Sequence, residues 1–298
     1  MQTETRLPSE RSQPPSANTT PHFIKGYSIE VLPHTAARIA SFRQLLPPET
    51  RVYIACIKDA PLADMVRTAK RLRADGFAVM PHIPARHIRN IAEFEDWLRH
   101  YRDEADVREA LVIGGDAARP AGDIESSMQL LESGLFDKYG FTRLHVAGHP
   151  EGNARITRDG ASRLDDALAW KQAFADRTDA EMAIVTQFFF DTAPLTAWIE
   201  RLRNSGVTLP VHLGVAGPTK LQSLIRYALA CGVGPSIAAL KKRALDLSRL
   251  LLPYEPDEML SALAAYAGKN PGMGIEQVHF FPLGGIEKTA DWIKSRTS

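Results

Sequence analysis

The sequence has few cysteines, no long apolar run and no excess of charge of either sign. Its two cysteines, Cys56 and Cys231, cannot form a disulfide framework or a cysteine-rich zinc cluster, which indicates a reducing compartment. No run approaches about 18 consecutive apolar residues, and no apolar segment follows the N-terminal charges. We therefore expect no transmembrane helix, no secretory signal and a cytoplasmic location. The 36 basic and 35 acidic residues nearly cancel, which argues against nucleic acid or an anionic membrane as a partner.

The composition that is present is typical of a globular protein with a large core. Hydrophobic residues make up 44% of the 298 residues and charged residues 24%, which is more apolar material than a disordered chain contains. Residues 1–21 differ, because they are polar, rich in proline and serine and without apolar periodicity. We predict a flexible tail over 1–21 and one catalytic domain over 22–298. A homo-oligomer is compatible with this composition.

Eight short apolar runs alternate with stretches of helical spacing from Tyr27 onward. The runs are Tyr27–Leu32, Val52–Ile57, Phe77–Ile83, Ala110–Gly114, Arg143–Gly148, Met182–Phe188, Pro210–Val215 and Gln277–Leu283. Such alternation is typical of βα units, and eight of them close a barrel. We predict a single α/β domain with the (β/α)8 TIM-barrel fold. An open six-stranded sheet with a helical appendage is the structural alternative.

Helical spacing of apolar residues marks four segments between the runs: 62–72, 91–101, 164–174 and 195–202. The interval between the seventh and eighth runs is too long for one helix. It holds three helical stretches, at 219–230, 236–252 and 256–267. We predict that these are extra helices within one loop of the barrel.

Polar residues that end the predicted strands are the candidates for chemistry, because the active site of such a barrel lies at the C-terminal ends of its strands. They are Glu30, His82, Asp116, His149, Glu151, Asn153 and Gln187. Glu30 interrupts an apolar run, where a carboxylate is costly unless it is hydrogen-bonded or functional. Gly115 before Asp116 lets a ligand approach the backbone closely. Structural roles remain open for each: an ion pair for Glu30, a loop cap for His82 and an ordinary turn for Gly114-Gly115-Asp116.

The string Thr186-Gln187-Phe188-Phe189-Phe190-Asp191 is the most informative one. An amide at the end of an apolar strand precedes aromatic rings that can stack on a flat heterocycle. At least one of the three phenylalanines is expected to be core. We predict that Gln187 and Phe189 bind substrate.

Other chemistries receive less support from the residues. His149, Glu151 and Asn153 could be drawn with His82 and Asp116 as a metal site, but histidines and acids at strand ends serve general polar binding as often, and we predict no metal. Lys171 lies in a helical stretch, which disfavours a Schiff base. The glycine pairs match neither a P-loop nor a dinucleotide-binding fingerprint.

Taken in order, several motifs resemble the methylenetetrahydrofolate reductase family. They are Glu30 in YSIEVLP, Pro81-His82-Ile83, Gly115-Asp116, Ala147-Gly148-His149-Pro150-Glu151-Gly152, the Thr186–Asp191 string and Val278-His279-Phe280-Phe281. Their order covers the chain from about Tyr27 to Ile293. The resemblance implies a (β/α)8 enzyme of one-carbon metabolism that moves a hydride between NAD(P)H and 5,10-methylenetetrahydrofolate, usually through bound FAD, in either direction.

The resemblance also implies roles for individual residues. Glu30 would protonate the folate so that its five-membered ring opens, and Gln187 would bind the pterin. Asp116 would tune charge beside the flavin or the pterin. Residues lining the cofactor would be His82, Gly115, Asp116, His149, Asn153 and Lys171.

The chain departs from the family pattern mainly where FAD would bind. Gly114, His149 and Asn153 stand where the family typically has arginine, tyrosine and histidine, and Ala55 and Gly285 replace a threonine and an arginine. We therefore expect weak or absent FAD binding and a retained folate-facing core. Two alternatives stay open: a barrel methyltransferase or lyase acting on a pterin, and a non-catalytic pterin-binding barrel.

Overall fold

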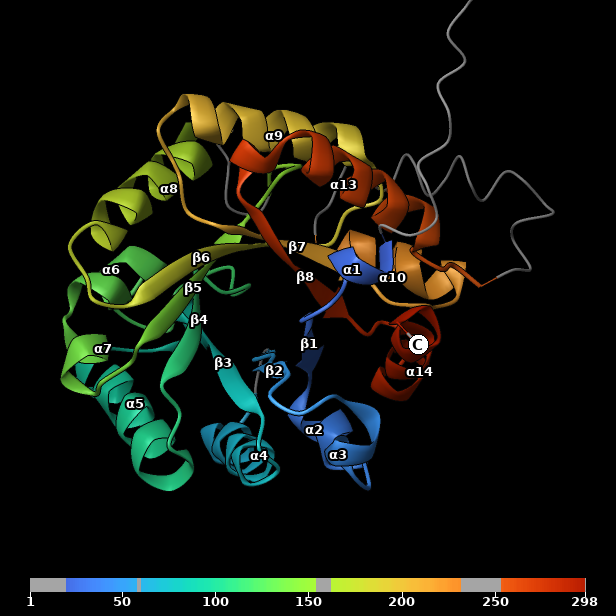
Figure 1. Cartoon of the computed structure of the whole chain (residues 1–298). Coiled ribbons are helices and arrows are strands. Elements are labelled where there is room, and N and C mark those ends of the chain that lie inside the picture. Colours follow the sequence, from blue (N-terminus) through green and yellow to red (C-terminus); the bar gives the residue numbers. More distant parts are fainter. Residues whose placement is uncertain (1–19, 58–59, 154–161, 232–252, 298) are drawn as a thin grey trace, which may run out of the picture.

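Eight parallel strands close into a barrel in chain order (Figure 1). The computed structural model describes residues 20–57, 60–153, 162–231 and 253–297. The strands are β1 Ser28–Val31, β2 Arg51–Ile54, β3 Ala78–Pro84, β4 Glu109–Ile113, β5 Arg143–Gly148, β6 Glu181–Thr186, β7 Val211–Ala216 and β8 Ile275–Phe281. β1 pairs with β8 through Ser28 with His279 and Ile29 with Phe280, which closes the ring. The predicted (β/α)8 barrel is confirmed, and the open sheet is excluded.

Each predicted run overlaps one observed strand. Successive side chains of a strand face the barrel interior and the surrounding helices in turn, and both environments are buried. In β5, Leu144 and Val146 are 0% exposed and belong to the core between strands and helices, whereas His145 points into the barrel toward Tyr53. Both faces of a parallel barrel strand are covered, so the strands are recognisable as apolar runs. A polar residue inside such a run therefore marks the barrel interior.

Helices surround the strands (Figure 1). The longer ones are α4 Leu62–Ala74, α5 Ile91–Ala105, α8 Ser162–Ala175, α9 Thr192–Asn204, α10 Leu221–Cys231, α13 Asp257–Lys269 and α14 Ile286–Thr297. The shorter ones are α1 Thr20–Phe23, α2 Pro33–Ala36, α3 Phe42–Leu45, η1 Ala85–His87, α6 Ser127–Glu132, α7 Leu135–Lys138 and η2 Pro271–Met273. The four helices predicted between the strands are confirmed as α4, α5, α8 and α9.

The interval between β7 and β8 contains α10 and α13, which confirms two of the three predicted extra helices. The third, at 236–252, lies outside the described residues, as do residues 1–19 of the predicted tail. The last two residues of that tail, Thr20 and Pro21, begin α1, which contacts α13 and α14. No helix in the described ranges combines the length and the apolar composition needed to cross a membrane.

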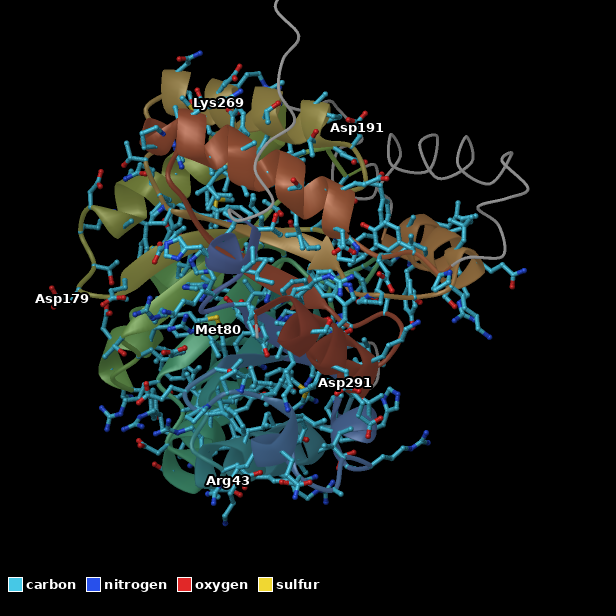
Figure 2. The ribbon with its side chains drawn as sticks, turned by 45° about the vertical axis from the view of Figure 1, so that its right-hand side comes forward. Arg43, Met80, Asp179, Asp191, Lys269 and Asp291 are labelled. Carbon is cyan, nitrogen blue, oxygen red and sulfur yellow. The ribbon has the colours of Figure 1, made fainter. Side chains whose placement is uncertain are left out.

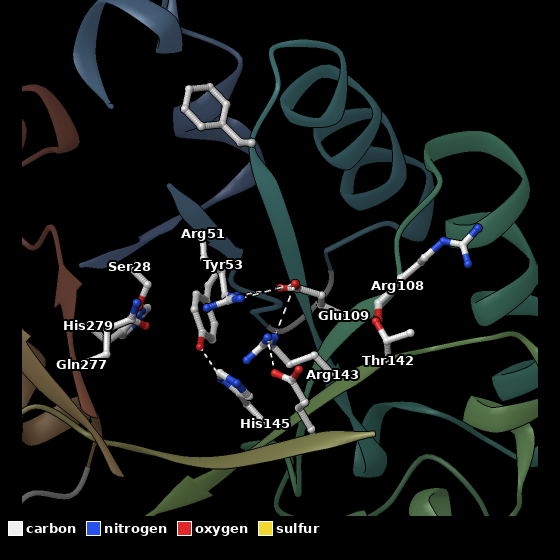
Figure 3. A network of polar contacts seen from close by, with 12 residues as sticks. Ser28, Arg51, Tyr53, Arg108, Glu109, Thr142, Arg143, His145, Gln277 and His279 are labelled. Atoms are coloured by element: carbon white, nitrogen blue, oxygen red, sulfur yellow. Dashed lines mark hydrogen bonds and ion pairs between the residues drawn. The ribbon is translucent and has the colours of Figure 1, made fainter. Parts of the chain in front are cut away.

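The barrel interior is filled in layers from its N-terminal to its C-terminal end. The N-terminal layer is charged: Arg51 Nε lies 2.6 Å from Glu109 Oε2, and Arg143 contacts both Glu109 and Glu181 (Figure 3). A small apolar cluster of Tyr53, Met80, Leu111 and Val185 lies above it. Figure 2 shows Met80 near the centre of the barrel, with charged residues such as Arg43, Asp179 and Lys269 at the periphery.

Three buried histidines share the middle of the barrel with this apolar cluster. His145, His212 and His279 are each at most 2% exposed. They lie on β5, β7 and β8, and each ring contacts Tyr53 or another of these histidines inside the barrel. The barrel is therefore more polar inside than the branched apolar side chains that usually fill such barrels would make it.

Candidate active site

Glu30 and His82 meet at the C-terminal end of the barrel. Glu30 lies on β1 and His82 on β3, and Glu30 Oε2 is 3.2 Å from His82 Nε2. Their side chains are 18% and 12% exposed, so the pair lies mostly below the surface of the barrel mouth. A carboxyl group in this position can exchange a proton with a ligand above it, and the His82 ring is its polar neighbour below the rim.

Asp116 lies beside the same mouth, in the loop after β4, and pairs with a residue that we did not predict. Its Oδ1 is 2.8 Å from Nε2 of His87, which belongs to the short helix η1 after β3. Its carboxylate also contributes to the raised pKa of Cys56, about 11, for which burial is the larger cause. The Asp116 side chain is 56% exposed, so a ligand could reach it.

Gly115 allows this arrangement through its backbone. Its φ is +89°, and a Cβ at this position would lie 3.1 Å from Pro84 Cβ and 3.3 Å from His87 Cδ2. A left-handed backbone and close contacts both favour glycine here. At Gly114, by contrast, a Cβ would meet no atom within 4 Å.

Gln187 follows β6 directly and lies at the same end of the barrel. Its backbone N–H donates to the Gly148 carbonyl at 3.1 Å, which continues the β5–β6 pairing by one residue. Gly214 of β7 packs so closely that a Cβ there would lie 2.8 Å from the Gln187 carbonyl oxygen. The backbone on both sides therefore fixes where the Gln187 side chain begins.

The three phenylalanines after Gln187 pack as core, which corrects one prediction. Phe189 is 1% exposed and belongs to the core between strands and helices, so it has no face open to a substrate. Phe188, 3% exposed, packs with Phe281. The strand ends at Thr186, and the alternation of inward and outward positions does not extend to Phe189. Asp191 caps α9, because its Oδ1 accepts a hydrogen bond from the backbone N–H of Ala193 at 3.0 Å.

Lys171 reaches the end of β5 from helix α8. The side chain is buried, and burial lowers the pKa of Lys171 to about 8. His149, just after β5, has a pKa lowered to about 4 by burial and by the charge of Lys171. Asn153 is also buried, four residues further on. A buried cation beside a neutral imidazole can bind an anionic group such as a phosphate.

The structure therefore gathers most of the predicted site residues at one end of the barrel. Glu30, His82, Gly115 and Asp116 lie at the ends of β1, β3 and β4, and Gln187 and His149 at the ends of β6 and β5. The residues that sequence reasoning missed are His87 and the interior residues Tyr53, His145, His212 and His279. The histidine at an inward position of three predicted strands was a signal that could have identified the last three. No cluster of three or more histidine, cysteine or acidic ligands suited to a metal occurs in the part of the chain that the structure describes.

Comparison with known proteins supports the motif-based resemblance. No protein-family model matches the chain. Over 157 residues it is 25% identical to methylenetetrahydrofolate reductase 1 of Schizosaccharomyces pombe, a match that covers 51% of this chain and 23% of the yeast protein. The resemblance to the methylenetetrahydrofolate reductase family is confirmed. The chain is a divergent relative that aligns with less than a quarter of that yeast protein.

A solved structure supports the fold. A protein from Clostridium thermocellum, described as binding two copies of 5-methyl-5,6,7,8-tetrahydrofolic acid, superposes with a TM-score of 0.55 at 9% identity. The superposition covers 94% of this chain and 98% of that one. At this level of identity, the likeness shows that the two share a barrel architecture.

Proposed function

We propose that the protein is an oxidoreductase that transfers a hydride between NAD(P)H and the one-carbon unit of tetrahydrofolate, interconverting 5,10-methylenetetrahydrofolate and 5-methyltetrahydrofolate. The observation that carries the proposal is Glu30, a half-buried carboxyl group 3.2 Å from His82 at the barrel mouth. The resemblance assigns the acid of this reaction to that position. The methyltetrahydrofolate bound by the Clostridium thermocellum barrel supports folate as the ligand class.

The chemistry requires one proton and one hydride. In the reductive direction, Glu30 gives its proton to the folate nitrogen, the bond from that nitrogen to the methylene carbon breaks, and an iminium forms on the folate. Reduced nicotinamide supplies the hydride that this methylene carbon receives. His82 holds the Glu30 carboxyl group in place, and each reduction leaves Glu30 as a carboxylate that must regain a proton.

Other residues at the mouth bind and orient the reactants in this proposal. Gln187 offers an amide to the hydrogen-bonding edge of the pterin, and Asp116, fixed by His87, faces the pterin or the nicotinamide. Lys171, with its pKa near 8, is positively charged in most molecules at pH 7 and suits a phosphate of the cofactor.

The residues at the cofactor positions fit FAD poorly. Gly114 presents no side chain, and a Cβ there would meet open space, so the family's cationic group has no counterpart at that position. The low pKa of His149 keeps its ring neutral at pH 7. Loss of two hydrogen bonds to a charged group weakens affinity by about 10²-fold or more. We therefore place the nicotinamide directly against the folate and derive no step through a flavin.

A single purified preparation tests this proposal. Its absorbance spectrum is recorded first, and FAD is then titrated into the protein; we expect no flavin bands and no stoichiometric binding. 5,10-Methylenetetrahydrofolate is then added with NADH or with NADPH, and loss of the nicotinamide absorbance is followed. Enzyme-dependent oxidation of one of them, with 5-methyltetrahydrofolate as product, is the expected result.

Other outcomes would contradict specific parts. Flavin that stays bound through gel filtration would restore a flavin-dependent route and overturn the direct one. Folate binding without any change in nicotinamide absorbance, in either direction, would overturn the oxidoreductase. It would favour the methyltransferase, the lyase or the pterin-binding barrel instead.

A further inference from the structure

A column of polar side chains runs through the barrel below Glu30, and the chemistry at the mouth does not by itself require it. Its central members are Ser28, Tyr53, His145, His212 and His279, each at most 2% exposed. Buried polar groups cost free energy unless they are hydrogen-bonded. Figure 3 shows two of their contacts, Tyr53 with His145 and Ser28 with His279.

The lower half of the column leads to solvent at the N-terminal end of the barrel. Tyr53 Oη lies 2.6 Å from His145 Nδ1. The rings of His145 and His212 meet edge to face, with centroids 4.7 Å apart. His212 Nε2 is 3.6 Å from Glu276 Oε2, and the Glu276 side chain is 56% exposed.

The unpaired ring nitrogens identify where the series is incomplete. His145 Nε2 and His212 Nδ1 are both buried without a hydrogen-bond partner in the described chain, and they belong to these two neighbouring rings. His82 Nε2, 3.2 Å from Glu30 Oε2, also makes no hydrogen bond there. If His145 Nδ1 carries the hydrogen and donates it to Tyr53 Oη, then His145 Nε2 is an acceptor and can receive a proton from His212 Nδ1. A small ring rotation or one water molecule would connect the two nitrogens.

The upper half of the column leads toward Glu30. Ser28 Oγ lies 2.9 Å from His279 Nδ1, and the ring centroids of His279 and Tyr53 are 4.3 Å apart. Ser28 also lies near enough to the Tyr53 hydroxyl to lower the pKa of Tyr53, although burial raises that pKa far more. His279 is close enough to His82 for their charges to interact, and His82 contacts Glu30.

We propose that this column is a proton path that returns a proton to Glu30 from the N-terminal end of the barrel while folate and nicotinamide cover the mouth. The inference rests on the proposed function, because it assumes that Glu30 loses one proton in each reduction. The proton enters from solvent at Glu276 and passes through His212, His145, Tyr53, Ser28, His279 and His82. Each imidazole accepts a proton on one nitrogen and releases one from the other, and each hydroxyl oxygen accepts one proton as it releases its own, so no other reactant is required.

Burial, helped by nearby charges, keeps two of the column's histidines, His145 and His279, in the neutral form that such transfer needs. Burial lowers the pKa of His145 and His279 well below their usual range, and the charges of His212, Arg51 and Arg143 lower that of His145 further. Glu109 pairs with both arginines. Neutral imidazole has one acceptor nitrogen and one donor N–H, which allows a proton to pass in one direction.

Tyr53→Phe tests the path in its middle, because it removes the hydroxyl and keeps the ring. Met80→Leu is the matched control, since Met80 belongs to the same interior cluster and lies next to Tyr53 in the register of β2 and β3. We expect Tyr53→Phe to lower steady-state kcat severalfold and to raise its solvent isotope effect. The first turnover, which uses the proton already on Glu30, should keep its rate, and Met80→Leu should behave like the wild type. Equal slowing of the first and later turnovers, or no slowing, would overturn the path.

Glu276→Gln tests the entrance, with Glu181→Gln as its control. Both carboxylates are exposed at the N-terminal end, but Glu181 pairs with Arg143 and contacts no histidine of the column in the described chain. We expect only Glu276→Gln to lower steady-state kcat, and a small buffer acid such as imidazole to restore it. Equal effects of the two substitutions would contradict an entrance at Glu276.

A measurement without substrates separates the path from the proposed function. Exchange of the histidine ring N–H and tryptophan indole N–H hydrogens with solvent can be followed by NMR in protein labelled at both residue types. We expect slower exchange at His279 in Tyr53→Phe than in the wild type, with the buried Trp198 indole N–H unchanged. If this holds and no folate reduction occurs, the proposed function fails and the path stands. If reduction occurs and exchange is unchanged, the path alone fails.

Discussion

The two ends of the barrel hold their charged groups in opposite ways. At the N-terminal end, Arg51, Glu109, Arg143 and Glu181 form a series in which every charge faces one of opposite sign. At the C-terminal end, the acids Glu30 and Asp116 face His82 and His87, whose charge depends on pH. Permanent pairs fix the charge state and stabilise the fold, whereas acid–histidine pairs leave a proton available for exchange.

The largest expected effect comes from the mouth. Glu30→Gln keeps the shape of the side chain but cannot deliver a proton, and loss of general acid catalysis costs about 10²- to 10⁴-fold in turnover. The free energy of unfolding and folate affinity, measured by urea denaturation and calorimetry, should change little. Glu181→Gln at the opposite end is the control and should retain turnover. A Glu30→Gln enzyme with near wild-type turnover would reduce Glu30 to a structural role.

Low pH should destabilise the fold through the buried histidines that lie between the two ends of the barrel. Burial lowers the pKa of His145 and His279, so at pH above about 6.5 both the folded and the unfolded protein hold them neutral. Below about pH 6.5 these histidines bind protons in the unfolded state, whereas in the folded state they stay neutral. Stability should then fall by about 1.4 kcal/mol per pH unit for each histidine.

Urea denaturation at pH 7.5, 6.0 and 5.0 measures this dependence. His145→Gln should be less stable at pH 7.5 but show a flatter decline toward pH 5.0. His100→Gln, which changes an exposed histidine on α5, should keep the wild-type slope. An unchanged slope in His145→Gln would show that other groups cause the loss.

A substitution at the N-terminal end should lower stability and leave turnover unchanged, which is the reverse of the expectation for Glu30 at the mouth. Glu109→Gln leaves Arg51 and Arg143 without their shared partner, and we expect it to lower the free energy of unfolding by about 1.5–3 kcal/mol. The first-turnover rate should remain that of the wild type, because Glu109 lies at the end of the barrel away from Glu30. A lower first-turnover rate without a loss of stability would contradict the view that the N-terminal end stabilises the fold and the mouth carries the chemistry.

The smallest expected effect is a difference in stability between alanine substitutions at two neighbouring glycines of the mouth. Gly115→Ala forces a side chain into a left-handed backbone against Pro84 and His87, and should cost about 1–2 kcal/mol of stability. Gly114→Ala meets open space and should change stability by less than about 0.5 kcal/mol. Thermal denaturation of the two variants measures the difference. Equal costs would show that the loop adjusts around Gly115.

Local pattern was sufficient to predict the barrel and the position of its mouth. Each strand is a short apolar run, and the rule that strand C-termini build the site placed Glu30, His82 and Asp116 at one end. Phe189 was predicted to bind substrate because an aromatic ring can stack on a flat heterocycle, but its ring is 1% exposed and packs in the core. Lys171 could not be placed from periodicity, because a helical residue reaches the mouth only when its helix packs against the barrel.

The sequence by itself determined where the eight strands lie, through short apolar runs that alternate with helical spacing. Only the tertiary structure decided which of their side chains meet, because closing the barrel joins residues far apart in the chain. Ser28 contacts His279 across 251 positions, and Tyr53 contacts His145 across 92. Alternation is a local property of an extended backbone, whereas the pairing of inward side chains depends on the register of all eight strands.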